Sequence, residues 1–288
     1  MLKIATDCSG IGSPEQSLKN LNIPHEIVFA CEKDKYARET YLANFTPKTM
    51  FDDLTIRDNT PNELYSDLYV AGFPCQAFSI SGKRLGFDDV RGTIFFNCAD
   101  YIKKQQPKYF IFENVKGLLS HDKPKGSKSK HGRTFQTIIN LLGQTINGQT
   151  PFYYQDDSLN YNLHYTILNS KDFGVPQSRE RVFMVGIRND LPNNFVFPKG
   201  SPLTKTLGDV LEKKVDDKYF FSPKMLNYFL SRKGNFNGGR LNLKYSDDIA
   251  STLTSSSKSV DISDNLIVTN EILGKVKFEV NENSPANF

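Results

Sequence analysis

The stretch "AGFPCQAFS" holds a single cysteine, Cys75, just after the apolar run "DLYV". The preceding proline and the Gln-Ala-Phe-Ser that follows are unlike a regular buried helix or strand. An isolated cysteine usually serves as a small buried apolar residue. On an accessible loop, however, a thiol can act as a nucleophile. The local sequence therefore makes Cys75 a candidate nucleophile.

A carboxylate at the end of an apolar run is the second candidate. The segment "FIFENV" places Glu113 and Asn114 where a buried strand is expected to end. A carboxylate in such a place is costly unless it forms hydrogen bonds, and a positioned carboxyl group can donate a proton to a substrate. The alternative is a helix cap.

Two arginines form the third candidate. In "QSRERVFMVGIR", Arg179 and Arg181 alternate on a predicted strand, so their side chains are expected to share one face and one cleft. Adjacent guanidinium groups need acceptors such as a base carbonyl, a carboxylate or a phosphate. Exposed arginines on an edge strand are the alternative.

A glycine turn near the amino terminus is typical of a nucleotide-like ligand site. "DCSGIGSPEQSL" reads as a strand end, a turn with Gly10 and Gly12, and a helix start, although it lacks the third glycine of the dinucleotide fingerprint. Glu32 follows the next predicted strand, where it can accept hydrogen bonds from ribose hydroxyls. The alternatives are a simple tight turn and a solvated carboxylate that stabilises the next helix.

Alternating hydrophobic patterns must position these residues. Strands are predicted over residues 2–7, 26–32, 67–72, 108–115, 160–168 and 181–188, and helices over 13–21, 33–45, 93–105 and 134–146. This alternation predicts an α/β fold with a doubly wound, Rossmann-like sheet, whose ligands bind at the carboxyl ends of the strands.

Two regions break the alternation. Residues 121–133, "HDKPKGSKSKHGR", carry five Lys or Arg and one Asp, and this loop either contacts phosphates or is simply solvated. From about residue 195 the chain becomes rich in Asn, Ser, Lys and Gly. We therefore predict a catalytic and cofactor-binding domain over 1–194 and a smaller, irregular region over 195–288.

Composition limits the class of protein. The chain has 288 residues, a net charge of +4 and four cysteines. The cysteines form no CxxC pair, so neither a metal site nor a disulfide framework is indicated. The apolar runs are too short to cross a bilayer and the start lacks a secretory signal, which favours a cytoplasmic protein.

Five blocks in order resemble the carbon-5 cytosine DNA methyltransferases, which use S-adenosylmethionine. They are "DCSGIG", "GFPCQAFS", "RGTIFF", "FENVKGLL" and "DFGVPQSRERVFMVGIR", and they span roughly residues 1–190. The resemblance implies a Rossmann-like methyltransferase sheet followed by a target-recognition region. It also implies methyl transfer to carbon 5 of a cytosine that is flipped out of a specific duplex DNA sequence.

The resemblance assigns a role to each candidate. Cys75 adds to carbon 6 of the cytosine, and Glu113 protonates or hydrogen-bonds the ring nitrogen N3. Arg181 holds the ring carbonyl oxygen, and Arg179 lines the pocket. Asn114 fixes the local backbone.

For S-adenosylmethionine, the resemblance assigns Glu32 to the ribose and Asp53 to the adenine amino group. The other expected cofactor-binding residues are Ser9, Gly10, Ile11, Gly12, Leu54, Pro74 and Ile94.

The sequence departs from this family in two places. Cys8 stands where a phenylalanine usually packs on the adenine, and no match to the last two family motifs precedes Phe288. We therefore expect a second polypeptide to supply those motifs, as in split enzymes of prokaryotes or phages. Residues 265–288 as a substitute closing element are the alternative.

Two other functions stay open at this stage. A transfer-RNA cytosine methyltransferase uses the same fold and similar motifs. A catalytically inactive DNA-binding relative is the third hypothesis, which the presence of Cys75, Glu113, Arg179 and Arg181 disfavours.

Overall fold

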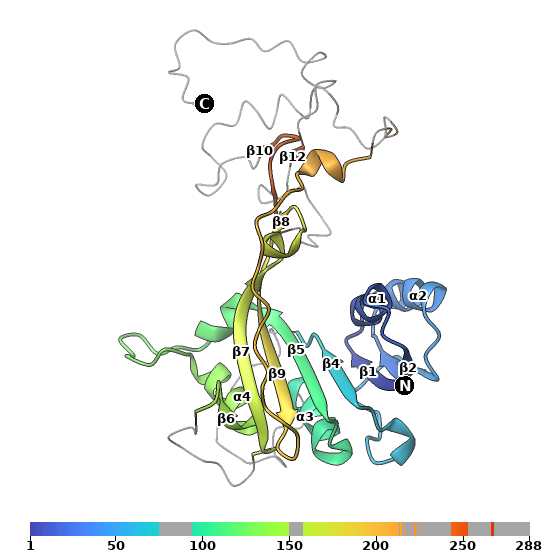
Figure 1. Cartoon of the computed structure of the whole chain (residues 1–288), viewed down its shortest axis with the longest axis vertical. Coiled ribbons are helices and arrows are strands. Elements are labelled where there is room, and N and C mark those ends of the chain that lie inside the picture. Colours follow the sequence, from blue (N-terminus) through green and yellow to red (C-terminus); the bar gives the residue numbers. More distant parts are fainter. Residues whose placement is uncertain are drawn as a thin grey trace. The chain divides into compact units, whose positions relative to one another are not determined.

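The computed structural model describes residues 1–74, 94–149, 158–212, 243–252 and 266–267, with the single positions 214, 216, 222 and 224 (Figure 1). The chain divides into two compact units. Unit 1 comprises residues 1–168 and 180–197, and unit 2 comprises 169–179 and 198–288.

Unit 1 is built on an eight-stranded sheet with the order β3-β2-β1-β4-β5-β9-β7-β6. Its strands are β1 (Leu2–Asp7), β2 (His25–Cys31), β3 (Thr49–Phe51), β4 (Leu68–Ala71), β5 (Tyr109–Val115), β6 (Gly143–Ile146), β7 (Tyr161–Asn169) and β9 (Glu180–Arg188). Strands β3, β2, β1, β4 and β5 pair in parallel, whereas β9 is antiparallel to β5.

Helices cover both faces of this sheet. They are α1 (Ser13–Asn20), α2 (Lys35–Asn44), α3 (Ile94–Gln105) and α4 (Arg133–Leu142), with short 3-10 turns η1 (Asn62–Leu64) and η3 (Lys116–Ser120). Adjacent residues of β1 face opposite sides. Ile4 packs with Leu18 of α1, whereas Ala5 belongs to the core that includes α3 and α4. The doubly wound α/β fold is thus confirmed.

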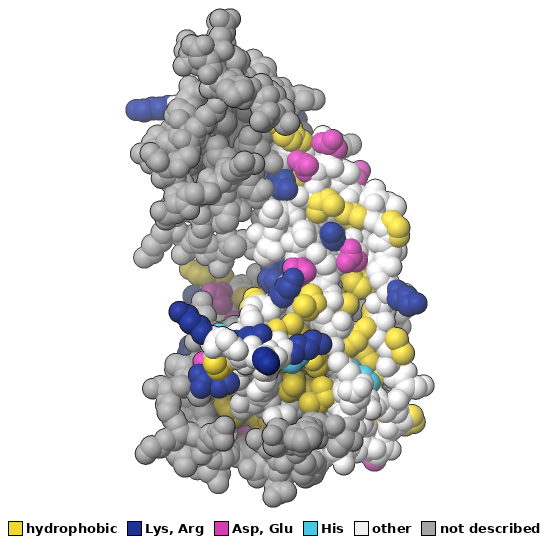
Figure 2. Space-filling model, turned by 90° about the vertical axis from the view of Figure 1, so that its left-hand side faces the viewer, with side chains coloured by type: hydrophobic (Ala, Val, Ile, Leu, Met, Phe, Trp, Pro, Cys, Tyr) yellow, Lys and Arg dark blue, Asp and Glu magenta, His cyan; other side chains and the backbone are white. Residues whose placement is uncertain are grey.

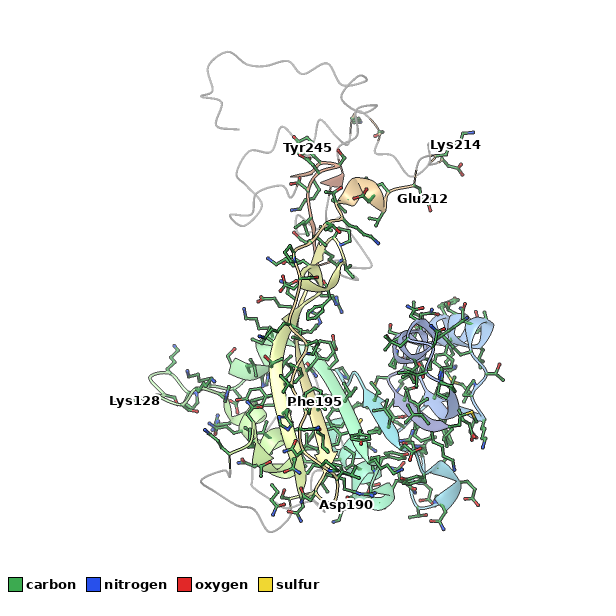
Figure 3. The ribbon with its side chains drawn as sticks, in the orientation of Figure 1. Lys128, Asp190, Phe195, Glu212, Lys214 and Tyr245 are labelled. Carbon is green, nitrogen blue, oxygen red and sulfur yellow. The ribbon has the colours of Figure 1, made fainter. Side chains whose placement is uncertain are left out.

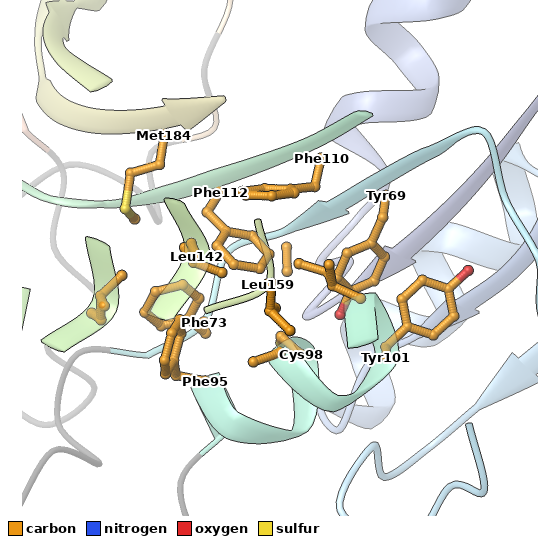
Figure 4. Packing of buried hydrophobic residues seen from close by; sticks show 14 of the residues in the cluster. Tyr69, Phe73, Phe95, Cys98, Tyr101, Phe110, Phe112, Leu142, Leu159 and Met184 are labelled. Atoms are coloured by element: carbon orange, nitrogen blue, oxygen red, sulfur yellow. The ribbon is translucent and has the colours of Figure 1, made fainter. Parts of the chain in front are cut away.

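The larger core is rich in aromatic rings from β4, β5 and α3 (Figure 4). Phe112 of β5 lies 5.4 Å from Phe73, and Phe73 lies 5.3 Å from Phe95 of α3, measured between ring centroids. Such pairs add about 0.5–1.5 kcal/mol each beyond their burial. Phe73 immediately precedes the Pro-Cys dipeptide, so this core anchors the chain entering that segment.

One predicted element is wrong over its last four residues. The helix expected over 134–146 ends at Leu142, and residues 143–146 form β6, which pairs in parallel with β7. Gly143 is extended and buried, and a Cβ there would meet the Leu163 side chain at 3.0 Å. Close strand packing at a glycine therefore overrides the helical pattern.

The described residues of unit 2 form short elements. They are η4 (Ser170–Phe173), β8 (Gln177–Ser178), η5 (Leu207–Asp209), β10 (Leu243–Lys244), β11 (Ala250–Ser251) and β12 (Leu266–Ile267). β8 pairs with β11 and β10 pairs with β12, both in parallel. Segment 169–179 therefore pairs, through β8, with β11, which lies about seventy residues later in the chain.

In the described part of the chain, no helix combines the length and apolar character that a membrane span requires.

Candidate active site

The carboxyl ends of four neighbouring strands lie at one edge of the sheet in unit 1. Asp7 at the end of β1 pairs with Cys31 at the end of β2 and with Ala71 at the end of β4. Ala71 pairs in turn with Phe112 near the end of β5. Segments that leave these ends carry most of the predicted site residues, so the fold brings distant parts of the chain to one edge.

The glycine turn after β1 requires its glycines. Gly10 and Gly12 have φ angles of +55° and +93°, a left-handed conformation that favours glycine. A Cβ on Gly12 would lie 2.3 Å from the Phe45 ring, whereas nothing lies within 4 Å of a Cβ on Gly10. The turn is therefore closely packed behind Gly12 and open beside Gly10, which leaves room for a ligand against the backbone.

Glu32 closes this turn. Its Oε2 accepts a hydrogen bond from the Gly10 amide at 2.8 Å, and its Oε1 accepts one from the Asp34 amide at 2.9 Å. Asp34 itself caps α2 by accepting from the Ala37 amide. Each Glu32 oxygen retains a second lone pair, so the carboxylate can also accept a hydrogen bond from a ribose hydroxyl.

Ser9 and Ile11 flank the turn in opposite ways. Ser9 is buried, and its Oγ accepts from the Cys31 amide at 3.0 Å, so this side chain ties β1 to β2. Ile11 is 59% exposed and presents an apolar side chain beside the turn. Burial of such a side chain against a bound ligand is favourable.

The remaining cofactor candidates differ in accessibility. Asp53 accepts hydrogen bonds from the Thr55 hydroxyl and amide, which lower the pKa of its carboxyl. Leu54 is buried, Ile94 at the start of α3 is half-buried against the larger core, and Pro74 is exposed. Asp53 thus stays ionised and able to accept a further hydrogen bond from a ligand amino group.

Cys75 lies outside the described residues, but the chain immediately before it is held tightly. The Asn114 amide group donates to the Phe73 carbonyl at 2.7 Å, and the Asn114 Oδ1 accepts from the Val115 amide. The Phe73 ring is buried in the core. Asn114 therefore ties the end of β5 to the segment that leads into Pro74 and Cys75.

Glu113 and Arg181 form an ion pair at this edge. Arg181 Nε lies 3.0 Å from Glu113 Oε1, and the two side chains are 15% and 34% exposed, respectively. Gly72, which immediately follows β4, lies beside the other Glu113 oxygen, since a Cβ there would be 3.8 Å from Oε2. Glu113 belongs to β5 and does not cap a helix, so the helix-cap alternative is wrong.

Arg179 does not share a strand with Arg181. It lies between β8 and β9 in unit 2, where its amide donates to Asn169 Oδ1 at 2.9 Å. The expectation that both arginines alternate on one strand is wrong, because the chain passes from one compact unit to the other at this point. The role of Arg179 stays a prediction.

A buried ion pair beneath the glycine turn was not anticipated from the sequence. Arg57 donates to both carboxylate oxygens of Asp7, at 2.5 and 2.7 Å, and Tyr69 donates to Asp7 Oδ2 at 2.5 Å. The guanidinium also stacks 4.3 Å above the Phe29 ring. An acidic residue at the end of a buried strand signals that a cation must lie nearby, but the identity of that cation depends on the fold.

Cys8 follows this pair and is unsuited to nucleophilic chemistry. Burial, followed by the negative charges of Asp7 and Glu32, raises the pKa of its thiol to about 12. The side chain is half-buried and its φ of +50° is left-handed. Cys8 therefore remains a protonated thiol within the turn.

Comparisons with known proteins agree with these motifs. Residues 3–286 match the model of the family described as C-5 cytosine-specific DNA methylase. Type II methyltransferase M1.ScrFI of Lactococcus lactis subsp. cremoris is 42% identical over 72% of this chain and 48% of its own length. Type II methyltransferase M.NgoBI of Neisseria gonorrhoeae is 40% identical over 74% of this chain and 59% of its own. The chain thus spans about half to three fifths of these relatives.

A solved structure supports the fold. The crystal structure of a mutant DNMT2 of Spodoptera frugiperda superposes with a TM-score of 0.65 at 21% identity, over 96% of this chain and 77% of that one. Together with the family match and the two relatives, this fold confirms the resemblance seen in the sequence motifs: the chain belongs to the C-5 cytosine-specific DNA methylase family.

Proposed function

We propose that this protein transfers a methyl group from S-adenosylmethionine to carbon 5 of a cytosine in duplex DNA. The observation that carries the proposal is the Glu113–Arg181 pair, at the end of the strand beside the one that leads into Cys75. A carboxyl and a guanidinium at one point can contact the ring nitrogen and the ring carbonyl of one cytosine. Family membership and the Pro-Cys-Gln sequence support the same reading.

Cys75, Glu113 and Arg181 each act on a different atom of the cytosine base. The Cys75 thiolate adds to carbon 6, while Glu113 donates a proton or hydrogen bond to N3, so that electron density develops at carbon 5. Arg181 holds the carbonyl oxygen and keeps the Glu113 side chain in place. Once carbon 5 carries the methyl group that bound S-adenosylmethionine would supply, loss of the carbon-5 proton to a base allows the Cys75 sulfur to leave by elimination.

The turn and its neighbours fit the cofactor. S-adenosylmethionine supplies an electrophilic methyl group when bound. Open space beside Gly10, an exposed Ile11 and the ionised Asp53 match the adenine ring, which has an apolar face and an exocyclic amino group. Glu32, held between two backbone amides, is the residue proposed for the ribose.

Covalent trapping tests this proposal. DNA of mixed sequence that carries 5-fluorocytosine should form an adduct with the wild-type chain in the presence of S-adenosylmethionine, because fluorine cannot leave as a proton does. The adduct is read as a shift on a denaturing gel. The same DNA with ordinary cytosine is the control, and trapping that persists in Cys75→Ala contradicts the assignment.

The nucleic acid and the target sequence need a separate measurement. Bisulfite sequencing of host DNA, with and without expression of this chain, should show methylation at one recurring sequence. If transfer RNA were methylated and DNA were not, the RNA alternative would replace this proposal. Residues 195–288 remain the proposed target-recognition region.

A second polypeptide that completes the enzyme remains a prediction. It is tested by assaying methyl transfer with the 288-residue chain alone. Full turnover by a monodisperse monomer excludes such a partner, whereas activity that appears only in extracts of the natural host supports it.

A further inference from the structure

The loop between η3 and α4, residues 121–133, is an ordered basic surface, here called the basic loop. Lys123, Lys125, Lys128 and Lys130 are all exposed. In the part of the chain that the structure describes, none of these four lysines forms an ion pair. The one acid of the loop, Asp122, is already paired with Arg133 at 2.8 Å. Among the described residues, the positive charge of the four lysines is therefore uncompensated.

The base of the basic loop is closed by several bonds. The Gly132 amide donates to the Leu119 carbonyl at 2.8 Å, and a Cβ on Gly132 would lie 1.9 Å from the His121 carbonyl oxygen. A hydrogen bond of 2.8 Å also joins His121 Nδ1 and Thr134 Oγ1. The two ends of the loop thus touch, and only glycine fits at position 132.

His131 attaches the basic loop to the body of unit 1. Its Nε2 lies 2.8 Å from the Tyr165 hydroxyl of β7, and its ring lies 5.0 Å from the Phe135 ring of α4. A loop that is merely solvated needs no such attachment. Because the backbone is already ordered, a ligand that binds the lysines does not have to order it.

The basic loop leaves the sheet on the side of the candidate active site. η3 follows Val115 at the carboxyl end of β5, the strand that carries Glu113, and the loop follows η3. Lys128 lies at the outer end of the loop, away from the sheet (Figure 3). Lys and Arg side chains gather on the face toward which the loop projects (Figure 2).

We infer that the basic loop is a contact surface for the phosphate backbone of duplex DNA, separate from the residues that hold the target base. Phosphates are the ligands that an array of uncompensated lysines favours, and their binding releases condensed counterions. This inference rests on the proposed function to the extent that DNA is the substrate. The contact contributes affinity without sequence preference.

The salt dependence of DNA binding tests the inference. Binding of a mixed-sequence duplex is followed by fluorescence anisotropy without cofactor, from roughly 50 to 200 mM KCl. The test variant carries Gln at Lys123, Lys125, Lys128 and Lys130. A charge-matched control carries Gln at the exposed Lys19, Lys48, Lys103 and Lys104. Thermal melts verify that both variants are folded.

Each lysine that contacts a phosphate should reduce the slope of log K against log salt by about 0.9. Relative to the wild type, the slope of the loop variant should be smaller in magnitude by roughly two to four. The slope of the control should be smaller by less than about one. Equal slopes for the loop variant and the wild type overturn the inference. Tighter loop-dependent binding to a transfer RNA than to the duplex overturns the choice of DNA.

The two proposals fail separately. If 5-fluorocytosine DNA is trapped but the slopes are equal, the proposed function stands and the basic loop does not bind phosphates. If the slopes differ but no adduct forms, even after an extract of the natural host is added, the loop binds DNA and the proposed methyl transfer is wrong.

Discussion

Glu113 is a single residue whose chemical role can be separated from its structural role. Glu113→Gln keeps a side chain of the same size but cannot supply a carboxyl proton. We expect methyl transfer to fall by roughly 10²- to 10⁴-fold, which is typical of lost proton transfer. Binding of S-adenosylhomocysteine, measured by calorimetry, should change little, since Glu113 lies on β5 and the proposed cofactor turn follows β1. A collapse of cofactor binding would make Glu113 structural.

The Asp7–Arg57 pair is also a residue-scale feature, and its role is stability. Both side chains are almost fully buried, at 0% and 1% exposed. Arg57→Met leaves the Asp7 carboxylate buried without its cation, which should lower the free energy of unfolding by about 3–5 kcal/mol. Breaking the exposed Lys116–Glu180 pair with Lys116→Met should cost no more than about 1 kcal/mol.

Urea denaturation measures both effects. Asp7→Asn combined with Arg57→Met should cost less than the sum of the two single changes, because the double variant leaves no unpaired buried charge. Equal losses for the buried and exposed pairs would contradict this account of Arg57.

At the scale of an element, the two glycines of the turn after β1 should respond differently to substitution by alanine. Gly12→Ala forces a Cβ into the Phe45 ring at a left-handed φ, whereas Gly10→Ala meets open space. We expect Gly12→Ala to destabilise the fold by several kcal/mol and Gly10→Ala by only about 1–2 kcal/mol, the cost of the left-handed conformation. Gly10→Ala should still weaken cofactor binding, since it fills the ligand side of the turn. Thermal melts and calorimetry with S-adenosylhomocysteine separate the two effects.

The basic loop gives an element-scale prediction on pH. Burial, followed by the charges of Lys130 and Lys123, lowers the pKa of His131. A lowered pKa in the folded state means that the neutral ring contributes stability above the usual histidine value of about 6.5, and that this stability is lost as the pH falls through the lowered value. After correction for the intrinsic exchange rates, amides of residues 121–133 should therefore be less protected from hydrogen exchange at about pH 5 than at about pH 7.5.

His131→Gln is the control for this pH effect. This variant should be less protected than the wild type at about pH 7.5, should resemble it more closely at about pH 5, and should lack the pH dependence. A wild-type loop whose exchange, corrected for intrinsic rates, does not change with pH would show that His131 does not attach it.

At the scale of the whole molecule, every residue proposed for the cofactor belongs to unit 1. S-adenosylhomocysteine at about one hundred times its dissociation constant should stabilise the folded protein that binds it by about 2.7 kcal/mol. We expect the added protection from hydrogen exchange to fall mainly on unit 1, near the ends of β1 and β2. Protection concentrated in residues 198–252 would place the cofactor elsewhere. Gly10→Ala, at the same ligand concentration, is the control.

Local patterns in the sequence predicted most of the sheet, the existence of the four helices and the family. Hydrophobic periodicity predicted six strands and four helices because burial imposes a period of two on strands and of 3.6 on helices. Gly10, Glu32 and Glu113 were each predicted to lie at the end of a strand, where such a sheet binds its ligands. Such inferences depend only on residues that are close in sequence, together with the right-handed rules of α/β folds.

Only the tertiary structure decided which partners these residues have. Glu113 pairs with Arg181 because β9 enters the sheet antiparallel to β5, and Asp7 pairs with Arg57 across fifty positions of chain. Gly143 begins a strand because it pairs with β7. Arg179 separates from Arg181 because it belongs to unit 2, whereas Arg181 belongs to unit 1. The hydrophobic pattern around a residue predicts whether its side chain is buried. Its partner is set by long-range packing and charge compensation, which no local pattern encodes.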